Sequence, residues 1–263
     1  MKKNSETEGA SDSRAKHAYL TLRERILRAD YPFGTILSPR QLARQFGMSL
    51  IPVAEALQRL EHEGLVERRP RAGTRVKIPT PEEVRGLYIV REALECQAAR
   101  LCAVHATAAE RVELRTIAVE LDRRFSESGS VTLKDRNKLY DLHTKHVHLH
   151  TRIADAARCQ TLWQAIERNH VLLFNFLYDV AAQRTVLPPG FHTELVEPIV
   201  RGDPEKADAA MRLHVRYGLS ETLLRLQPQI QQDGWRLGKG NSADGRRRAV
   251  SLSTQGNSPR NSR

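Results

Sequence analysis

Residues 38–66, SPRQLARQFGMSLIPVAEALQRLEHEGLV, contain the pattern around which the rest of the chain can be interpreted. Ser38 supplies a capping oxygen and Pro39 an early proline, so a short helix is predicted to begin here. Gly47 predicts a tight turn, after which apolar residues recur at helical spacing at Val53, Ala56, Leu57 and Leu60. Two short helices joined by a glycine-containing turn are typical of a helix-turn-helix, whose second helix enters the DNA major groove. Two helices of an ordinary bundle would give the same pattern.

The residues after the second helix predict a β-hairpin. Gly64 ends the helix, residues 65–66 can begin a strand, and residues 73–76, GTRV, can form the returning strand. Several basic side chains lie on or near this hairpin, where they could meet a phosphate backbone: Arg68, Arg69, Arg71 and Arg75. A helix-turn-helix followed by a basic hairpin wing is a much narrower class of domain than either part alone.

Residues 19–78 resemble the winged-helix domain of GntR-family bacterial transcription regulators. The resemblance is carried by the stretches LRERILRADYPFGTIL, RQLARQFGMS, PVAEALQRLEHEGLV and GTRV. It implies a double-stranded DNA operator as partner, contacted by Arg40 and Ser49, which match the family's DNA-contacting pattern. The family usually has arginine at the positions of Leu50 and Ala54, so no operator sequence is implied.

Leu50 and Ile51 begin the predicted recognition helix, and two roles for them remain open. They either contact thymine methyl groups in the major groove or pack inside the domain. The full set of DNA contacts that we predict comes from the first helix, the recognition helix with its cap, and the wing: Arg40, Ser49, Leu50, Ile51, Arg69, Arg71, Gly73 and Thr74.

Length and charge favour two domains and a polyanionic partner, because the chain has 263 residues and a formal net charge of +11. Residues 1–79 hold 15 basic and 9 acidic side chains, whereas residues 80–230 hold 20 of each. The cysteines lack metal-binding spacing, the N-terminus lacks a signal segment, and no apolar run is long enough to span a membrane. We therefore expect a cytoplasmic protein with no membrane partner, which lies at the bacterial nucleoid when bound to DNA.

The chain is predicted to divide into four segments. Residues 1–15 are expected to be disordered, and residues 16–78 to form the winged helix-turn-helix, an α+β domain. Thr80, Pro81 and Glu83 then predict a capping box that starts a second domain over residues 79–228. Six helical patterns without a strand pattern in that segment predict an all-α antiparallel bundle. Residues 229–263 are rich in Gly, Ser and Arg, and we expect a disordered basic tail.

The second segment resembles the helical effector domain, called FCD, of the FadR branch of GntR regulators. The resembling stretches are LYIVREALECQAARL, HVHLHTRIADAARCQTL and FHTELVEPIVRGDPEKADAAMRLHV. Together with the winged helix, the resemblance extends from residue 19 to about residue 226. The order and spacing of the stretches are much more specific than any one of them.

Histidines in the second segment predict a metal centre. His146 and His150 lie four residues apart on one helix face, a spacing that lets two imidazoles reach one metal. Many FCD domains hold a metal with an Asp and a His four apart plus two later histidines. Alignment places His150 on the family histidine, His146 where Asp is common, and His192 and His214 on the later positions. Four imidazoles would favour Zn²⁺ or Ni²⁺ over Mg²⁺ or Ca²⁺, and hydrogen-bonded core histidines are the alternative.

Arg91 lies one helical turn before Glu95, and two roles remain open for it. The resemblance implies an arginine near this position that meets an acidic effector, and the planar guanidinium suits a carboxylate. A surface ion pair between Arg91 and Glu95 is the alternative.

The sequence thus favours a metabolite-responsive transcriptional regulator, a repressor in its simplest form, that binds a metal and a small carboxylate. A homodimer is expected, because helix-turn-helix proteins read paired half-sites. A metal-dependent enzyme acting on a small organic acid is the main alternative. Against this alternative, the sequence lacks the HExxH pattern, since Val147, His148 and Leu149 lie between His146 and His150. It also contains no nucleophile motif or phosphate loop. An architectural DNA-binding protein would not need a neutral bundle of this size.

Overall fold

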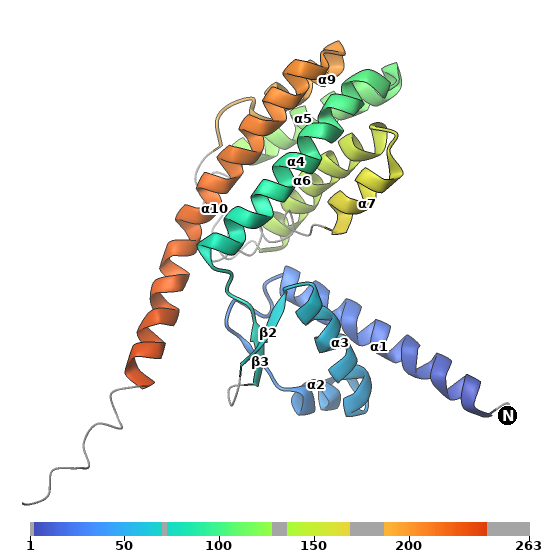
Figure 1. The fold of residues 1–263 in the computed structure, drawn as a ribbon, viewed down its shortest axis with the longest axis vertical. Helices are drawn as coiled ribbons and strands as arrows, with labels where there is room; N and C mark the ends of the chain where they lie inside the picture. Colours follow the sequence, from blue (N-terminus) through green and yellow to red (C-terminus); the bar gives the residue numbers. More distant parts are fainter. Residues whose placement is uncertain (1–2, 70–72, 128–135, 169–186, 241–263) are drawn as a thin grey trace, which may run out of the picture.

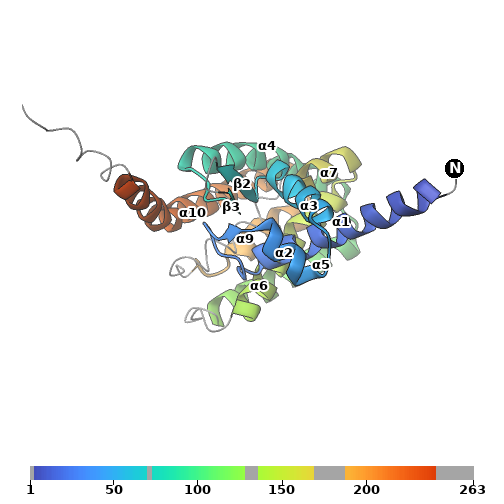
Figure 2. The same cartoon turned by 90° about the horizontal axis from the view of Figure 1, so that it is seen from below.

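The computed structural model describes residues 3–69, 73–127, 136–168 and 187–240. Figure 1 shows a small domain of helices and a short sheet beneath a longer bundle of helices. Figure 2, seen from below, shows that helices α1 and α10 project from the body on opposite sides. The predicted fold class, a winged helix-turn-helix followed by an all-α bundle, is confirmed over the described residues.

The small domain contains α1 (Lys3–Leu27), α2 (Pro39–Phe46) and α3 (Leu50–His62). The Ser38 side chain caps α2 by accepting a hydrogen bond from the backbone N–H of Gln41. Gly47 has φ 63°, a left-handed conformation that glycine adopts without strain, and this turns the chain from α2 into α3. The predicted helix-turn-helix is therefore confirmed.

The wing is an antiparallel sheet in which β2 (Val66–Arg69) pairs with β3 (Gly73–Val76), as the sequence predicts. A third strand, β1 (Ile36–Leu37), pairs with the other edge of β3 and gives the order β1-β3-β2. The sequence analysis did not predict β1, because two residues are too few to show an alternating pattern.

The bundle contains α4 (Pro81–His105), α5 (Ala108–Glu127), α6 (Arg136–Ala156), α7 (Gln160–Arg168), α9 (Phe191–Arg201) and α10 (Pro204–Gly240). The capping box that starts α4 is present in full: the Thr80 hydroxyl accepts from the Glu83 backbone N–H, and the Glu83 carboxylate accepts from that of Thr80. Helices α4 and α10 pack along each other, and α5 packs on α9 and α6.

Both ends of the described chain differ from the prediction. Helix α1 begins at Lys3, inside the segment expected to be disordered. Helix α10 continues to Gly240, into the segment 229–263 that was expected to be disordered. Composition alone underestimates such extensions, because a helix already anchored by packing gains one hydrogen bond for each residue added.

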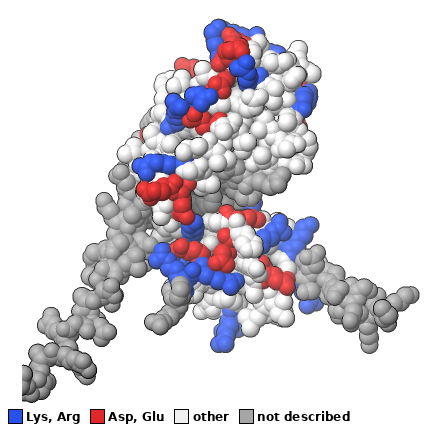
Figure 3. Space-filling model, viewed as in Figure 1, with Lys and Arg blue, Asp and Glu red and all other residues white. Residues whose placement is uncertain are grey.

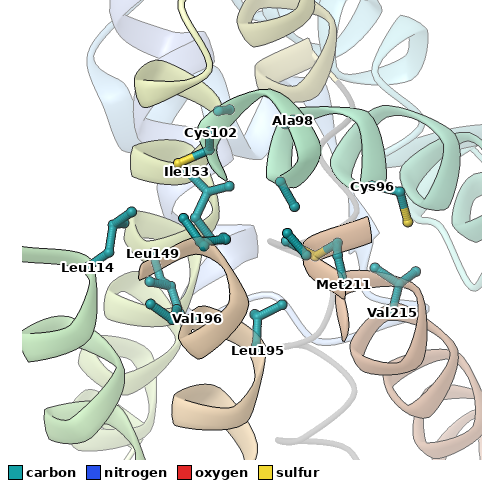
Figure 4. Packing of buried hydrophobic residues seen from close by; sticks show 14 of the residues in the cluster. Cys96, Ala98, Cys102, Leu114, Leu149, Ile153, Leu195, Val196, Met211 and Val215 are labelled. Atoms are coloured by element: carbon teal, nitrogen blue, oxygen red, sulfur yellow. The ribbon is translucent and has the colours of Figure 1, made fainter. Parts of the chain in front are cut away.

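A continuous apolar core holds the bundle together (Figure 4). Leu149 and Ile153 of α6 and Val196 of α9 are fully buried in it. Cys96 and Cys102 also lie in this core as free thiols, and burial raises their pKa to about 12.

The small domain has its own core, and α6 of the bundle reaches it. Leu139, near the start of α6, is buried among the apolar residues of the small domain, and Tyr140 packs against the same cluster. The Arg28 guanidinium, just after α1, lies 4.4 Å from the centroid of the Tyr140 ring. The two domains are therefore joined by a packed contact as well as by the chain between β3 and α4.

Candidate functional site

The recognition helix α3 exposes its first two residues. Leu50 is 48% and Ile51 64% exposed, whereas Val53, Leu57 and Leu60 on the opposite face are buried. The alternative in which Leu50 and Ile51 pack inside is therefore wrong for this structure. The inward face of α3 fixes which side of the helix is available to a partner.

Arg40 and Ser49, the two residues matched to the family's DNA-contacting pattern, lie on the exposed surface at the starts of α2 and α3. Ser49 occupies the N-cap position of α3, but its side chain makes no capping hydrogen bond. Its hydroxyl is therefore not used to cap the helix. Both positions suit contacts to a DNA backbone.

Three arginines of the wing, Arg68, Arg69 and Arg75, form ion pairs with glutamates, which offset their positive charge. Arg69 and Arg75 both contact the Glu67 carboxylate, at 3.2 and 2.6 Å, and Arg68 lies 3.2 Å from that of Glu61. Figure 3 shows acidic side chains interspersed with the basic ones over the small domain. Phosphate contacts would have to compete with these ion pairs.

Three further wing positions were predicted to contact DNA. Gly73 is exposed and has φ 81°, as expected for a residue at a tight bend. Thr74 is only 7% exposed in the central strand β3, so its side chain does not reach the surface, and we leave it out of the proposed contacts. Arg71 lies outside the described residues.

Three of the four predicted metal ligands converge on one point inside the bundle. The Nε2 atoms of His146, His150 and His214 lie 3.0 to 3.2 Å from one another. Tetrahedral zinc sites with Zn–N bonds of about 2.0–2.1 Å place their nitrogens about 3.3 Å apart. The three nitrogens therefore match one face of a metal coordination shell to within a few tenths of an ångström.

The fourth predicted ligand, His192, lies beside this group. Its ring centroid is 5.1 Å from that of His146 and 5.6 Å from that of His214. Its Nδ1 atom lies 2.8 Å from the Asp122 carboxylate, which also accepts hydrogen bonds from the backbone N–H groups of His192 and Thr193. Among the described residues, only His146, His150 and His214 form a group close enough to share an ion.

Glu95 positions His150, a role that the sequence analysis did not assign. The Nδ1 atom of His150 lies 2.6 Å from one Glu95 oxygen, and Arg91 Nε donates to the other at 2.6 Å. A carboxylate at Nδ1 keeps the proton there and leaves the Nε2 lone pair for a metal. Burial alone would raise the pKa of Glu95, but its contacts with Arg91 and His150 hold that pKa at about 2.

Two of the three converging histidines, His146 and His214, are held neutral. Burial, followed by the neighbouring imidazoles of His150 and His192, keeps the pKa of His146 and of His214 well below the usual range. Neutral imidazoles bind metals, whereas protonated ones do not. The group offers three imidazole nitrogens and no carboxylate oxygen.

A small cavity of about 50 Å³ adjoins the histidines. Its wall combines the imidazoles with two arginines and aromatic side chains, among them His146, His192, His214, Arg91, Arg225, Phe125, Phe191 and Tyr217. Such a volume holds a few water-sized groups. The cavity therefore suits a small ligand.

Arg91 belongs to this site and not to the surface. Both Arg91 and Glu95 are 3% exposed, so the alternative of a surface ion pair is wrong. The Nη2 atom of Arg91 has no hydrogen-bond partner among the described residues. Arg225, on α10, lines the same cavity and contacts Glu221 at 3.0 Å. The sequence signal that could have indicated Arg225 is its spacing of four from Glu221.

None of the described helices combines the length and the apolar character needed to cross a lipid bilayer.

Comparisons with known proteins agree over both domains. A model of the bacterial regulatory proteins of the gntR family matches residues 14–76, and a model of the FCD domain matches residues 86–217. The HTH-type transcriptional repressor RspR of Escherichia coli K12 is 26% identical over 80% of this chain and 89% of its own length. A probable D-xylose utilization operon transcriptional repressor of Paenarthrobacter nicotinovorans is 30% identical over 75% of this chain and 83% of its own length.

Solved structures show the same fold. A putative GntR transcriptional regulator from Rhodococcus sp. RHA1 superimposes with a TM-score of 0.63 at 21% identity, covering 80% of this chain and 98% of that one. The E. coli protein McbR/YncC gives a TM-score of 0.60 at 17% identity, covering 82% and 98%.

Proposed function

Because the chain belongs to the GntR family of bacterial transcriptional regulators and carries an FCD domain, we propose that it is a metabolite-responsive repressor whose bundle binds a metal and a small carboxylate. Transcriptional regulation is the function of this family. Membership of the family therefore excludes the alternative of a metal-dependent enzyme. Repression is supported by the two relatives that are named as repressors.

One observation carries the proposed sensing function: three buried imidazole nitrogens within 3.2 Å of one another beside a small cavity. His146, His150 and His214 would hold the metal, and His192, whose Nδ1 atom lies 2.8 Å from the Asp122 carboxylate, lies beside them. When bound, the metal would supply a positive centre for a carboxylate oxygen. Arg91 faces the same cavity with a buried guanidinium nitrogen, which suits the second oxygen of that carboxylate.

Selection of DNA from a random pool by the full-length protein tests the regulator function. The selected operator is then titrated with metal-free and zinc-loaded protein, with and without a panel of small mono-, di- and tricarboxylic acids. We expect a defined operator whose affinity changes with at least one acid only when zinc is present. Failure to enrich any sequence would contradict the proposal.

Arg40→Ala should weaken binding to that operator and reduce its dependence on salt. Each phosphate contact releases counterions, so the slope of log affinity against log salt should become shallower by about 1. Fluorescence anisotropy at several salt concentrations measures the slope. Arg100→Ala, an exposed arginine on the bundle, is the matched control and should leave it unchanged. An unchanged slope in Arg40→Ala would remove this residue from the interface.

Helix α6 couples the proposed sensor to the DNA-binding domain. It carries His146 and His150 in its middle, while Leu139, near its start, is buried in the core of the small domain. The chain between β3 and α4 offers a second route, since Lys77 and Glu83 lie 2.5 Å apart across it. A ligand that shifts α6 would therefore act on the small domain directly, in proportion to its differential affinity for the two states.

Leu139→Ala combined with Tyr140→Ala should uncouple the two domains. The variant should still bind zinc and the operator, because neither residue belongs to the histidine group or to the exposed face of α3. The acid-dependent change in operator affinity should be lost or much reduced, as measured by the same titration. Asp141→Ala, an exposed neighbour on α6, is the control. A normal acid response in the double variant would assign the coupling to residues 77–83.

We also propose a homodimer. Two half-sites in an operator require two recognition helices, and α4 and α10 expose large apolar side chains, namely Ile89, Val90, Leu213 and Leu224. Sedimentation of the purified protein should give twice the chain mass, and Val90→Glu with Leu213→Glu should give the monomer. A monomer of the unaltered protein, alone and on DNA, would contradict the dimer.

A further inference from the structure

The first two turns of the recognition helix expose no basic side chain. The exposed residues of α3 are Leu50, Ile51, Ala54, Glu55, Gln58, Arg59 and His62. The first basic side chain of α3 is Arg59, whose guanidinium lies 3.8 Å from the centroid of the Tyr19 ring and 3.7 Å from the Glu63 carboxylate. Bidentate recognition of guanine by Arg or Lys, the commonest specific contact in the major groove, is thus not offered by these two turns.

The start of the helix offers an apolar surface in place of a cation. Leu50 and Ile51 are 48% and 64% exposed in the first turn of α3, and it is the N-terminal residues of a recognition helix that contact base edges. Pro52 and Val53, which follow directly, are buried and fix this turn on the domain. The thymine 5-methyl group is the one apolar group that a base pair presents in the major groove.

We propose that Leu50 and Ile51 select operator half-sites by contacting thymine methyl groups. The inference rests on the DNA-binding function and adds the class of sequence that is recognised: thymine at the positions facing the first turn of α3. Arg40 and the wing would set the position of the protein on the DNA backbone, and Leu50 and Ile51 would distinguish the bases.

Replacement of single thymines by uracil in the selected operator tests this inference, because it removes only the methyl group. At one or two positions in each half-site, binding of the full-length protein should weaken about 3- to 10-fold, as expected from the loss of one buried methyl group. Uracil at the remaining positions should have no effect.

The Leu50→Ala, Ile51→Ala variant should bind the thymine operator more weakly and should not distinguish thymine from uracil. Both side chains are exposed, so its thermal unfolding should match that of the unaltered protein. Val119→Ala, which removes an exposed apolar side chain from α5 of the bundle, should keep the full sensitivity to uracil.

Two results would overturn the inference while leaving the regulator function intact. One is an operator that binds equally well after every thymine has been replaced by uracil. The other is a Leu50→Ala, Ile51→Ala variant that keeps the same sensitivity to uracil. If no operator is enriched at all, the DNA-binding proposal fails with it, so the two failures are distinguishable.

Discussion

The His150→Ala, His214→Ala variant should lose bound zinc almost completely, whereas the unaltered protein should hold about one ion per chain. Two of three converging Nε2 atoms are removed, and His146 alone cannot form a chelate. Because metal bound only by the folded state stabilises it, the zinc-dependent rise in melting temperature should vanish as well. Metal analysis after dialysis and thermal unfolding with and without zinc measure both effects.

Two exposed histidines provide the matched control for this variant. His105 on α4 and His148 on α6 both lie on the surface, so their joint replacement by alanine should leave zinc content unchanged. Retention of stoichiometric zinc in the His150→Ala, His214→Ala variant would show that these histidines only pack in the core. The metal would then have to be held elsewhere.

Arg91→Ala should destabilise the bundle by about 3–5 kcal/mol, the usual cost of leaving one partner of a buried ion pair without the other. Arg91 and Glu95 are both 3% exposed, and the guanidinium helps hold the pKa of Glu95 at about 2. Urea denaturation of the metal-free protein, followed by circular dichroism, measures the change in the free energy of unfolding.

Arg100→Ala gives the comparison within the same helix. Arg100 contacts Glu205 of α10 at 2.7 Å, but the two side chains are 45% and 68% exposed. An exposed pair contributes about 0–1 kcal/mol, so this variant should unfold close to the unaltered protein. Equal effects of the two substitutions would contradict a buried, structurally required Arg91–Glu95 pair.

The parts of the fold that sequence predicted well depend on short-range chemistry. The α2–α3 turn is set by a cap at Ser38 and a left-handed glycine at residue 47, and the start of α4 by the capping box at Thr80. Helix ends without such signals were placed wrongly, as for α1 and α10. Strand β1 exists because β3 offers it an edge, which no local pattern shows.

The candidate site also contains residues that the sequence could bring together and residues that it could not. His146 and His150 share a helix face by spacing alone, so sequence could pair them, whereas His192 and His214 were placed by family resemblance. The carboxylates that orient the rings, Glu95 and Asp122, come from α4 and α5, far away in sequence. No spacing rule connects them to their histidines, and only the packed bundle brings them together.

The central claim is that occupation of the histidine centre changes operator affinity. It is tested most directly by the dissociation constant of the selected operator, measured by anisotropy for the zinc-loaded protein with and without each carboxylic acid of the panel. The account predicts that at least one acid weakens binding about 5- to 150-fold, the usual range of coupling between two sites. The same acid should have no effect on the His150→Ala, His214→Ala variant. An equal shift in both proteins, or no shift with any acid in the unaltered one, would contradict it.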